Sequence, residues 1–119
     1  MKKKEFAATP MEINTFLREF KRILMTDNDE PEFIPRKYDF TYFGLDIIMA
    51  KNELLLLTYH HYDRGPTEDR NGDGSNVWEF GKPLDDGMAY IKLKNKDGHC
   101  KVLSFKSSTG PFTLPYKNW

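Results

Sequence analysis

The sequence lacks several features that would assign it to a familiar class. It has one cysteine, Cys100, so no internal disulfide can form, and this cysteine usage fits the reducing cytoplasm. No apolar run reaches the length of a transmembrane helix, and Leu54–Leu57 is only a short core stretch. The basic residues 2–4 begin like a signal peptide, but no apolar segment follows them, so we do not expect secretion.

Motifs of common catalytic and metal sites are also missing. There is no glycine-rich phosphate loop, and neither Ser104 nor Ser107 lies in the context of a hydrolase nucleophile. His60 and His61 are adjacent, and no histidine or cysteine has the spacing of a zinc site. We therefore expect neither a metal nor a cofactor. Repeats and interdomain linkers are absent, so the sequence predicts a single domain over residues 1–119.

The formal net charge is zero, which excludes a generally basic nucleic-acid-binding chain, but the charge is unevenly distributed. Residues 1–25 carry six Lys and Arg against three Asp and Glu, a net charge of +3. Residues 26–76 carry five against eleven, or −6, and residues 77–119 carry seven against four, or +3. The C-terminal part is therefore locally basic.

The N-terminal half begins with a helical pattern. Residues 11–25 place apolar side chains at helical spacing opposite Arg, Lys and Glu. Thr9 and Pro10 precede them as the expected N-cap and first helical residue. Beyond this helix, Pro35 limits any strand within 32–38 to an edge or a short piece.

A second helix is expected after a single helical turn over 40–44 that Gly44 ends. Asp46 predicts its N-cap, and the helix is expected over 47–57. Its composition is too apolar for a surface helix, so we expect it to be wedged against a sheet. A buried strand over 53–58 is the alternative.

The C-terminal third predicts the sheet. Residues 88–94 and 100–106 alternate with period two, and an Asp-Gly turn within 95–98 is the strongest short hairpin signal. Residues 77–81 predict a further strand. In the first hairpin strand one face is apolar, and the other holds Tyr90, Lys92 and Lys94. The fold class is therefore expected to be α+β, with N-terminal helices packed on a twisted antiparallel β-sheet.

Residues 59–76 predict a long polar loop rich in His, Arg and acidic side chains, and such loops are usually functional or disordered. Residues 69–74 match the opening of a calcium-binding loop. The match then fails, because Phe80 stands where a carboxylate is needed and a strand follows in place of a helix. An acidic loop over 68–76 that holds Ca²⁺ or a protein partner, in a non-catalytic binding module, stays as the alternative function.

A metal-free cluster is the principal hypothesis for a site. Cleaving RNA without a metal requires a base for the 2′-hydroxyl, an acid for the leaving 5′-oxygen and cations around the phosphate. The simpler alternative is a salt-bridged polar sheet face. The sequence offers as catalytic candidates Glu79, Tyr90, Lys92, Lys106 and Arg64, and as substrate-binding candidates Arg70, His60 and His61.

The order of these segments resembles the MqsR-type members of the RelE-like bacterial toxin superfamily. The resemblance covers about 11–106, and its most specific parts are two strands that bear Tyr-x-Lys and Ser-Phe-Lys. It is carried by Arg36, Phe43-Gly44-Leu45-Asp46, Val77-Trp78-Glu79, Ala89-Tyr90-Ile91-Lys92-Leu93 and Leu103-Ser104-Phe105-Lys106.

The resemblance implies a fold of the RelE-like, microbial-ribonuclease type and the activity of an mRNA interferase in a type II toxin–antitoxin system, neutralised by a partner antitoxin. It implies metal-independent cleavage by attack of the 2′-hydroxyl. By position, Tyr90 and Lys106 match the family's catalytic Tyr and C-terminal Lys, and Lys92 matches the Lys two residues after that Tyr. Arg64 stands near a basic catalytic position of the family, and Glu79 stands where the family has Gln.

Overall fold

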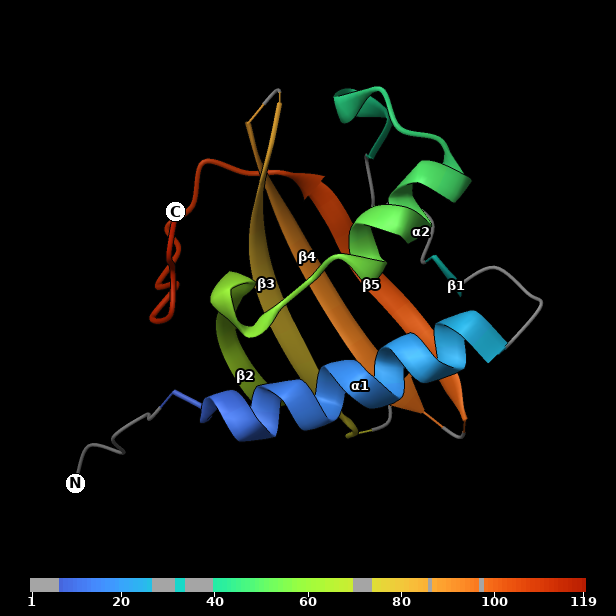
Figure 1. The fold of residues 1–119 in the computed structure, drawn as a ribbon, viewed down its shortest axis with the longest axis vertical. Helices are drawn as coiled ribbons and strands as arrows, with labels where there is room; N and C mark the ends of the chain where they lie inside the picture. The colour runs from blue at the N-terminus through green and yellow to red at the C-terminus, as the bar shows by residue number, and fades with distance from the viewer. Residues whose placement is uncertain (1–6, 27–31, 34–39, 70–73, 86, 97) are drawn as a thin grey trace.

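The computed structural model describes residues 7–26, 32–33, 40–69, 74–85, 87–96 and 98–119, and there it has two helices packed on one face of a sheet (Figure 1). The helices are α1 (Pro10–Thr26) and α2 (Ile47–Leu55), with short 3-10 helices η1 (Phe40–Phe43) and η2 (Tyr59–His61). The strands are β1 (Glu32–Phe33), β2 (Tyr62–Glu68), β3 (Asn76–Leu84), β4 (Gly87–Lys96) and β5 (His99–Ser107). The predicted α+β class, with helices on a twisted antiparallel sheet, is confirmed.

Helix α1 forms where the sequence predicts it and crosses one face of the sheet (Figure 1). Thr9 caps it reciprocally: its hydroxyl accepts from the Glu12 amide at 3.2 Å, and the Glu12 carboxylate accepts from the Thr9 amide at 2.9 Å. Phe16 stacks on Trp78 of β3 with ring centroids 4.9 Å apart. The fully buried side of the helix consists of Ile13, Leu17, Phe20, Ile23 and Leu24.

The sheet has the strand order β1-β5-β4-β3-β2. Neighbouring strands among β2 to β5 are antiparallel, and the short β1 pairs in parallel with β5 at the edge. The predicted hairpin over 88–94 and 100–106 is confirmed as β4 and β5. Its register shifts once, because Lys92 pairs with Ser104 while Leu93 pairs with Val102, which leaves Leu103 as an extra residue in β5. This shift brings Phe105 opposite Ile91 and Lys106 opposite Tyr90.

The hydrophobic core lies between the helices and the face of the sheet that they cover. Alternate residues of the strands point into it, as period two requires. Trp78 of β3 is only half-buried, because it lies beside Phe16 at the margin of the core. The fully buried strand residues on this face include Phe80, Ala89, Ile91, Leu93, Val102 and Phe105.

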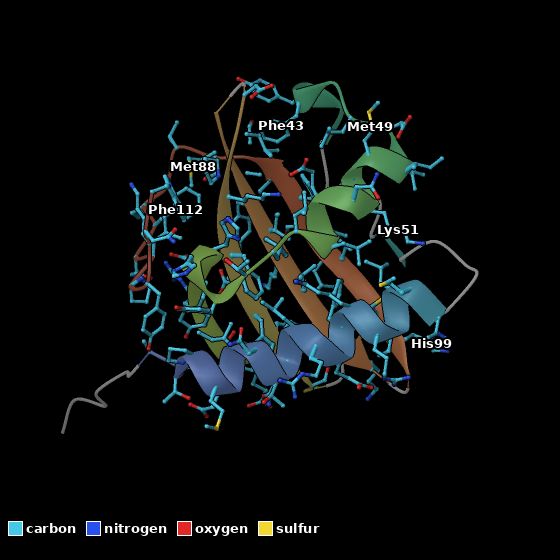
Figure 2. The ribbon with its side chains drawn as sticks, viewed as in Figure 1. Phe43, Met49, Lys51, Met88, His99 and Phe112 are labelled. Atoms are coloured by element: carbon cyan, nitrogen blue, oxygen red, sulfur yellow. The ribbon has the colours of Figure 1, made fainter. Side chains whose placement is uncertain are left out.

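Helix α2 differs from its prediction in both length and burial. Asp46 caps it as expected, accepting from the Met49 amide at 2.8 Å, but the helix ends at Leu55, so the alternative strand over 53–58 does not form. Ala50 and Leu54, one turn apart, are fully buried. Ile48, however, is 67% exposed, and Met49 projects away from the sheet (Figure 2). A nine-residue helix buries only one narrow stripe, so α2 packs on the sheet as expected but leaves part of its apolar surface exposed.

The long polar loop predicted over 59–76 is mostly regular structure. It contains η2 and then β2, which pairs with β3 at the edge of the sheet. Pro66 lies inside β2, where an edge strand tolerates a residue that cannot donate a ladder hydrogen bond. The register shifts on both sides of Arg64, which obscures the period-two pattern in the sequence.

Within the described ranges, no helix is long and apolar enough to cross a membrane.

Candidate functional site

The face of the sheet opposite the two helices, here called the outer face, carries the predicted catalytic residues. Strand pairing places Arg64, Glu79, Lys92 and Ser104 in one row across β2, β3, β4 and β5. A neighbouring row contains Gly81, Tyr90 and Lys106. Residues paired across antiparallel strands share a face, with Cβ atoms about 5 Å apart, so the two rows form one compact group. The structure therefore brings together all five predicted catalytic side chains.

Tyr90 and Glu79 are joined directly within this group. The Tyr90 hydroxyl donates a hydrogen bond to Glu79 Oε1 at 2.6 Å. Both side chains are half-buried. Burial raises the pKa of the Tyr90 phenol well above its ordinary value, and the hydrogen bond to Glu79 raises it further. Tyr90 therefore keeps its proton in the neutral pH range, which agrees with its donating the hydrogen bond to Glu79.

Two lysines, Lys92 and Lys106, are the register neighbours of this pair. In the part of the chain that the structure describes, no ion pair joins Lys92 or Lys106 to a carboxylate within 4.0 Å. The ammonium of the exposed Lys106 lies 6.0 Å from the centre of the Tyr90 ring, a cation–π distance. Lys92 lies between Glu79 and Ser104 and is half-buried. The salt-bridged polar face considered from the sequence is therefore not what these two lysines form.

Arg64 completes the positive side of the group. Its Nε lies 3.4 Å from Asp63 Oδ2, and about half of its side chain is exposed. The charge of Arg64 opposes the increase in the pKa of Tyr90, so the guanidinium is close enough to act on the phenol. Asp63 is buried, and the register shift after Tyr62 gives β2 one residue more than β3 at this point. This extra residue lets Asp63 and Arg64 lie together at the edge of the outer face.

Lys94, which alternates with Tyr90 and Lys92, is not part of a solvated face. It is only 4% exposed, and its ammonium donates to Asp69 Oδ2 at 2.9 Å. Asp69 follows the end of β2, so this residue contacts Lys94 from the neighbouring end of the sheet. On the face that these three residues share, Tyr90 and Lys92 are therefore half-buried and Lys94 is buried.

His60 and His61, predicted to bind substrate, lie on the other side of the sheet. They form η2, which Figure 1 shows in front of β3 on the side of the helices. His60 Nδ1 is 2.8 Å from the Tyr116 carbonyl oxygen, and His61 Nδ1 accepts from the Thr58 amide at 3.0 Å. Burial, together with the charge of Lys82, lowers the pKa of His61 to about 4. Neither histidine joins the outer face.

The calcium hypothesis concerns residues that are mostly not described. Arg70 and residues 71–73 lie outside the described part, so the structure tests neither the Arg70 prediction nor the full loop. Asp69, the first residue of the matching hexapeptide, is paired with Lys94. Among the described side chains, no group of three or more His, Cys, Asp and Glu residues is arranged to hold a metal ion.

The outer face also includes a segment to which the sequence assigned no role. Residues 108–119, here called the C-terminal tail, leave β5 and pass over the edge formed by β3 and β2 (Figure 1). The Phe112 ring lies against Gly81, and the Thr113 amide donates to Asp63 Oδ1 at 2.5 Å. One signal was available in the sequence, because an isolated glycine inside a strand often marks the close approach of another segment.

Comparisons of the chain with protein-family models, with curated proteins and with solved structures gave no match.

Proposed function

We propose that this protein is an endoribonuclease that cleaves RNA without a metal ion, by attack of the 2′-hydroxyl on the adjacent phosphate. The observation that carries the proposal is the Tyr90–Glu79 hydrogen bond flanked by Lys92 and Lys106. This arrangement supplies a proton acceptor, a proton donor and two cations on one face. These are the groups that the reaction requires.

The protonation state of the Tyr90 phenol decides which residue gives a proton and which accepts one. Because the pKa of Tyr90 is raised, Glu79 is the group that accepts the proton of the 2′-hydroxyl as its oxygen bonds to phosphorus. The bond from phosphorus to the 5′-oxygen breaks, and Tyr90 gives its proton to that oxygen, which is more basic than a phenolate. The proton on Glu79 then returns to Tyr90 along their hydrogen bond. The products are a 2′,3′-cyclic phosphate and a free 5′-hydroxyl.

The cations stabilise the charge that develops on the phosphate. In the strand register Lys92 stands opposite Glu79 and Lys106 stands opposite Tyr90, both toward β5, and Arg64 stands opposite Glu79 on the β2 side. Preorganised donors of this kind typically contribute a factor of about a hundred or more each to the rate. Arg64 is held near Asp63, which fixes its position at the edge of the face.

The biological setting that we propose follows from the resemblance to MqsR-type toxins. The chain would act on mRNA in the cytoplasm and be held inactive by a cognate antitoxin protein. The outer-face arrangement supports the nuclease part of this proposal, and the antitoxin rests on the resemblance alone. A small neighbouring reading frame that encodes a DNA-binding protein would support the complete system.

The test is expression in bacteria together with RNA cleavage in vitro. The wild-type chain is expected to arrest growth and shorten mRNAs, and Lys106→Ala combined with Tyr90→Phe is expected to relieve both effects. The termini of the cut RNA should be a cyclic phosphate and a 5′-hydroxyl. A stable double variant that remains as toxic as the wild type would locate the chemistry elsewhere. Wild-type protein that leaves growth and RNA intact would favour a non-catalytic binding module.

A further inference from the structure

The row that contains Tyr90 and Lys106 has no side chain of its own on β3. Gly81 occupies that position, and a Cβ added there would lie 2.9 Å from two carbons of the Phe112 ring. The ring of Phe112 therefore fills the place of the missing side chain. Phe112 and Met88 lie at the same corner of the molecule, and His99 lies at the opposite corner (Figure 2). The tail thus supplies the third member of the row, an aromatic ring beside Tyr90.

A buried carboxylate fixes Phe112 in this position. Asp63, 3% exposed, accepts from the amides of Thr113 and Leu114 at 2.5 and 3.2 Å, and from the Thr113 hydroxyl. These bonds hold the residues that immediately follow Phe112. Hydrogen bonds to a charged and buried acceptor are among the stronger interactions available to a protein. Asp63 also approaches Arg64, so one carboxylate positions both the tail and a cation of the outer face.

The end of the tail is fixed as firmly. The Tyr116 hydroxyl donates to the Ala8 carbonyl at 2.7 Å, and its ring lies against Tyr59 and Tyr62. The Tyr116 carbonyl contacts His60 Nδ1 at 2.8 Å. Held at Thr113, Leu114 and Tyr116, the tail is part of the outer face in the folded molecule.

We propose that Phe112 is the base-stacking platform of the site, which makes single-stranded RNA with an unpaired base its substrate class. This inference rests on the proposed nuclease function. Phe112 is half-buried, so part of its ring is open to solvent. Gly81, against which the ring lies, is paired with Tyr90 on the neighbouring strand about 5 Å away, so the ring belongs to the same row as the phenol. An aromatic ring beside cationic side chains is the usual means of holding unpaired nucleotides.

The test compares Phe112→Leu with Phe112→Tyr, because leucine preserves the apolar contact with Gly81 and lacks a π-face. Binding of a short unstructured RNA oligonucleotide is measured in the Tyr90→Phe background, beside an abasic oligonucleotide of the same length. Phe112→Leu is expected to weaken binding of the RNA about tenfold and to leave binding of the abasic strand unchanged. Phe112→Tyr is expected to restore RNA binding. In the otherwise wild-type enzyme, Phe112→Leu should raise KM with little change in kcat.

A second variant moves the ring without altering it. Gly81→Ala places a methyl group against Phe112, so it should displace the ring and reduce RNA binding by a similar factor. If the wild type cleaves RNA and Phe112→Leu binds RNA as tightly as the wild type, the platform is wrong and the nuclease proposal stands. The platform is also wrong if loss of the ring increases cleavage, because the tail would then be a cover. Wild-type protein that neither binds nor cleaves RNA would overturn the nuclease proposal and the platform together.

Discussion

Tyr90 and Glu79 lie on adjacent strands but are not opposite one another. Tyr90 is paired with Gly81 and Glu79 with Lys92, so the phenol reaches diagonally across the sheet to Oε1 at 2.6 Å. Diagonal contacts between strands are within the reach of long side chains. Because Gly81 has no side chain, no side chain directly opposite on β3 competes for the Tyr90 hydroxyl. The diagonal pair is therefore a consequence of the glycine that also admits Phe112.

Removing either member of the pair should reduce cleavage far more than stability. Tyr90→Phe and Glu79→Gln are each expected to slow single-turnover RNA cleavage about a hundredfold or more. Each variant loses one partly buried hydrogen bond, so we expect the free energy of unfolding to change by about 1 kcal/mol. Tyr42→Phe, at an exposed tyrosine of η1, is the matched control and should match the wild type in both measurements. If Glu79→Gln cleaves RNA at the wild-type rate, Glu79 takes no part in the proton transfers.

The phenol of Tyr90 should titrate later than an ordinary tyrosine. Burial and the hydrogen bond to Glu79 both raise its pKa, so its deprotonation is expected above about pH 10. Phenolate absorbance followed from neutral to strongly alkaline pH should contain a late component that Tyr90→Phe reduces. Burial also raises the pKa of Tyr62, so part of this component should stay. By the same reasoning, any loss of activity between pH 7 and 9 should not be due to Tyr90. If Tyr90→Phe instead removed absorbance that appears in the pH range of an ordinary tyrosine, the raised pKa of Tyr90 would be wrong.

Acid should destabilise the fold through His61. Its pKa is about 4 in the folded chain, whereas an unfolded histidine titrates near 6.5, so the unfolded state binds more protons between these values. Stability should therefore fall as the pH decreases from about 6.5 to 4, by about 1 to 2 kcal/mol because the ring is only half-buried. The free energy of unfolding in urea should differ less between pH 7 and pH 5 for His61→Gln than for the wild type. His99→Gln, at an exposed histidine, should leave the difference unchanged.

The two partners of the ion pair beneath α2 should differ in what their removal costs the free energy of unfolding. Lys82, 8% exposed, bonds the Glu53 carboxylate and approaches the Glu53 carbonyl at 3.4 Å. Glu53→Ala would leave the ammonium with the carbonyl alone, and we expect a loss of about 2 kcal/mol in urea unfolding, less than for a fully buried pair. Lys82→Met should be nearly neutral, because it replaces the charge with apolar volume. Glu53→Ala should then lower the free energy of unfolding much less in the Lys82→Met background than in the wild type. An equal loss in both backgrounds would show that the ion pair does not contribute to stability.

Calcium provides the test of the alternative function. If residues 68–76 do not hold Ca²⁺, neither added Ca²⁺ nor a chelator should change the melting temperature or RNA cleavage. A single ion at a hundred times its dissociation constant would stabilise the fold by about 2.7 kcal/mol, which is readily measured. A stabilisation of that size, lost in Asp69→Asn, would support the binding-module hypothesis. Mg²⁺ is the control for a non-specific effect of divalent cations.

Most of the fold was predictable because local signals agree with the tertiary structure. The period-two runs on both sides of Asp97-Gly98 fold as a hairpin, and Asp46 and Thr9 cap the helices that follow them. The positions of Tyr90, Lys92 and Lys106 on one face follow from the same alternation. In these segments one pattern determines both the local structure and the buried face.

The incorrect predictions concern residues whose environment depends on distant contacts. The polar composition of 59–76 indicated a loop, but as an edge strand β2 needs hydrogen bonds on one side only and tolerates Pro66. His60 and His61 looked accessible in that loop, whereas η2 places them on the helix side of the sheet. Asp63 looked like one more acidic loop residue, and only the tail fifty positions later makes it a buried anchor.

The contact between Tyr116 and Ala8 closes a loop of 108 positions, whereas β3, β4 and β5 are joined through short connections. Entropy favours closing short loops, so the hairpins that carry Tyr90 and Glu79 should assemble before the tail docks. The order of opening should be the reverse, with the tail and the start of α1 separating from the sheet as one unit. In native-state hydrogen exchange, the amides of Thr113 and Ala8 should then share one opening free energy below that of β4. A partly opened molecule would hold its acid–base pair intact and have nothing on which to stack a base.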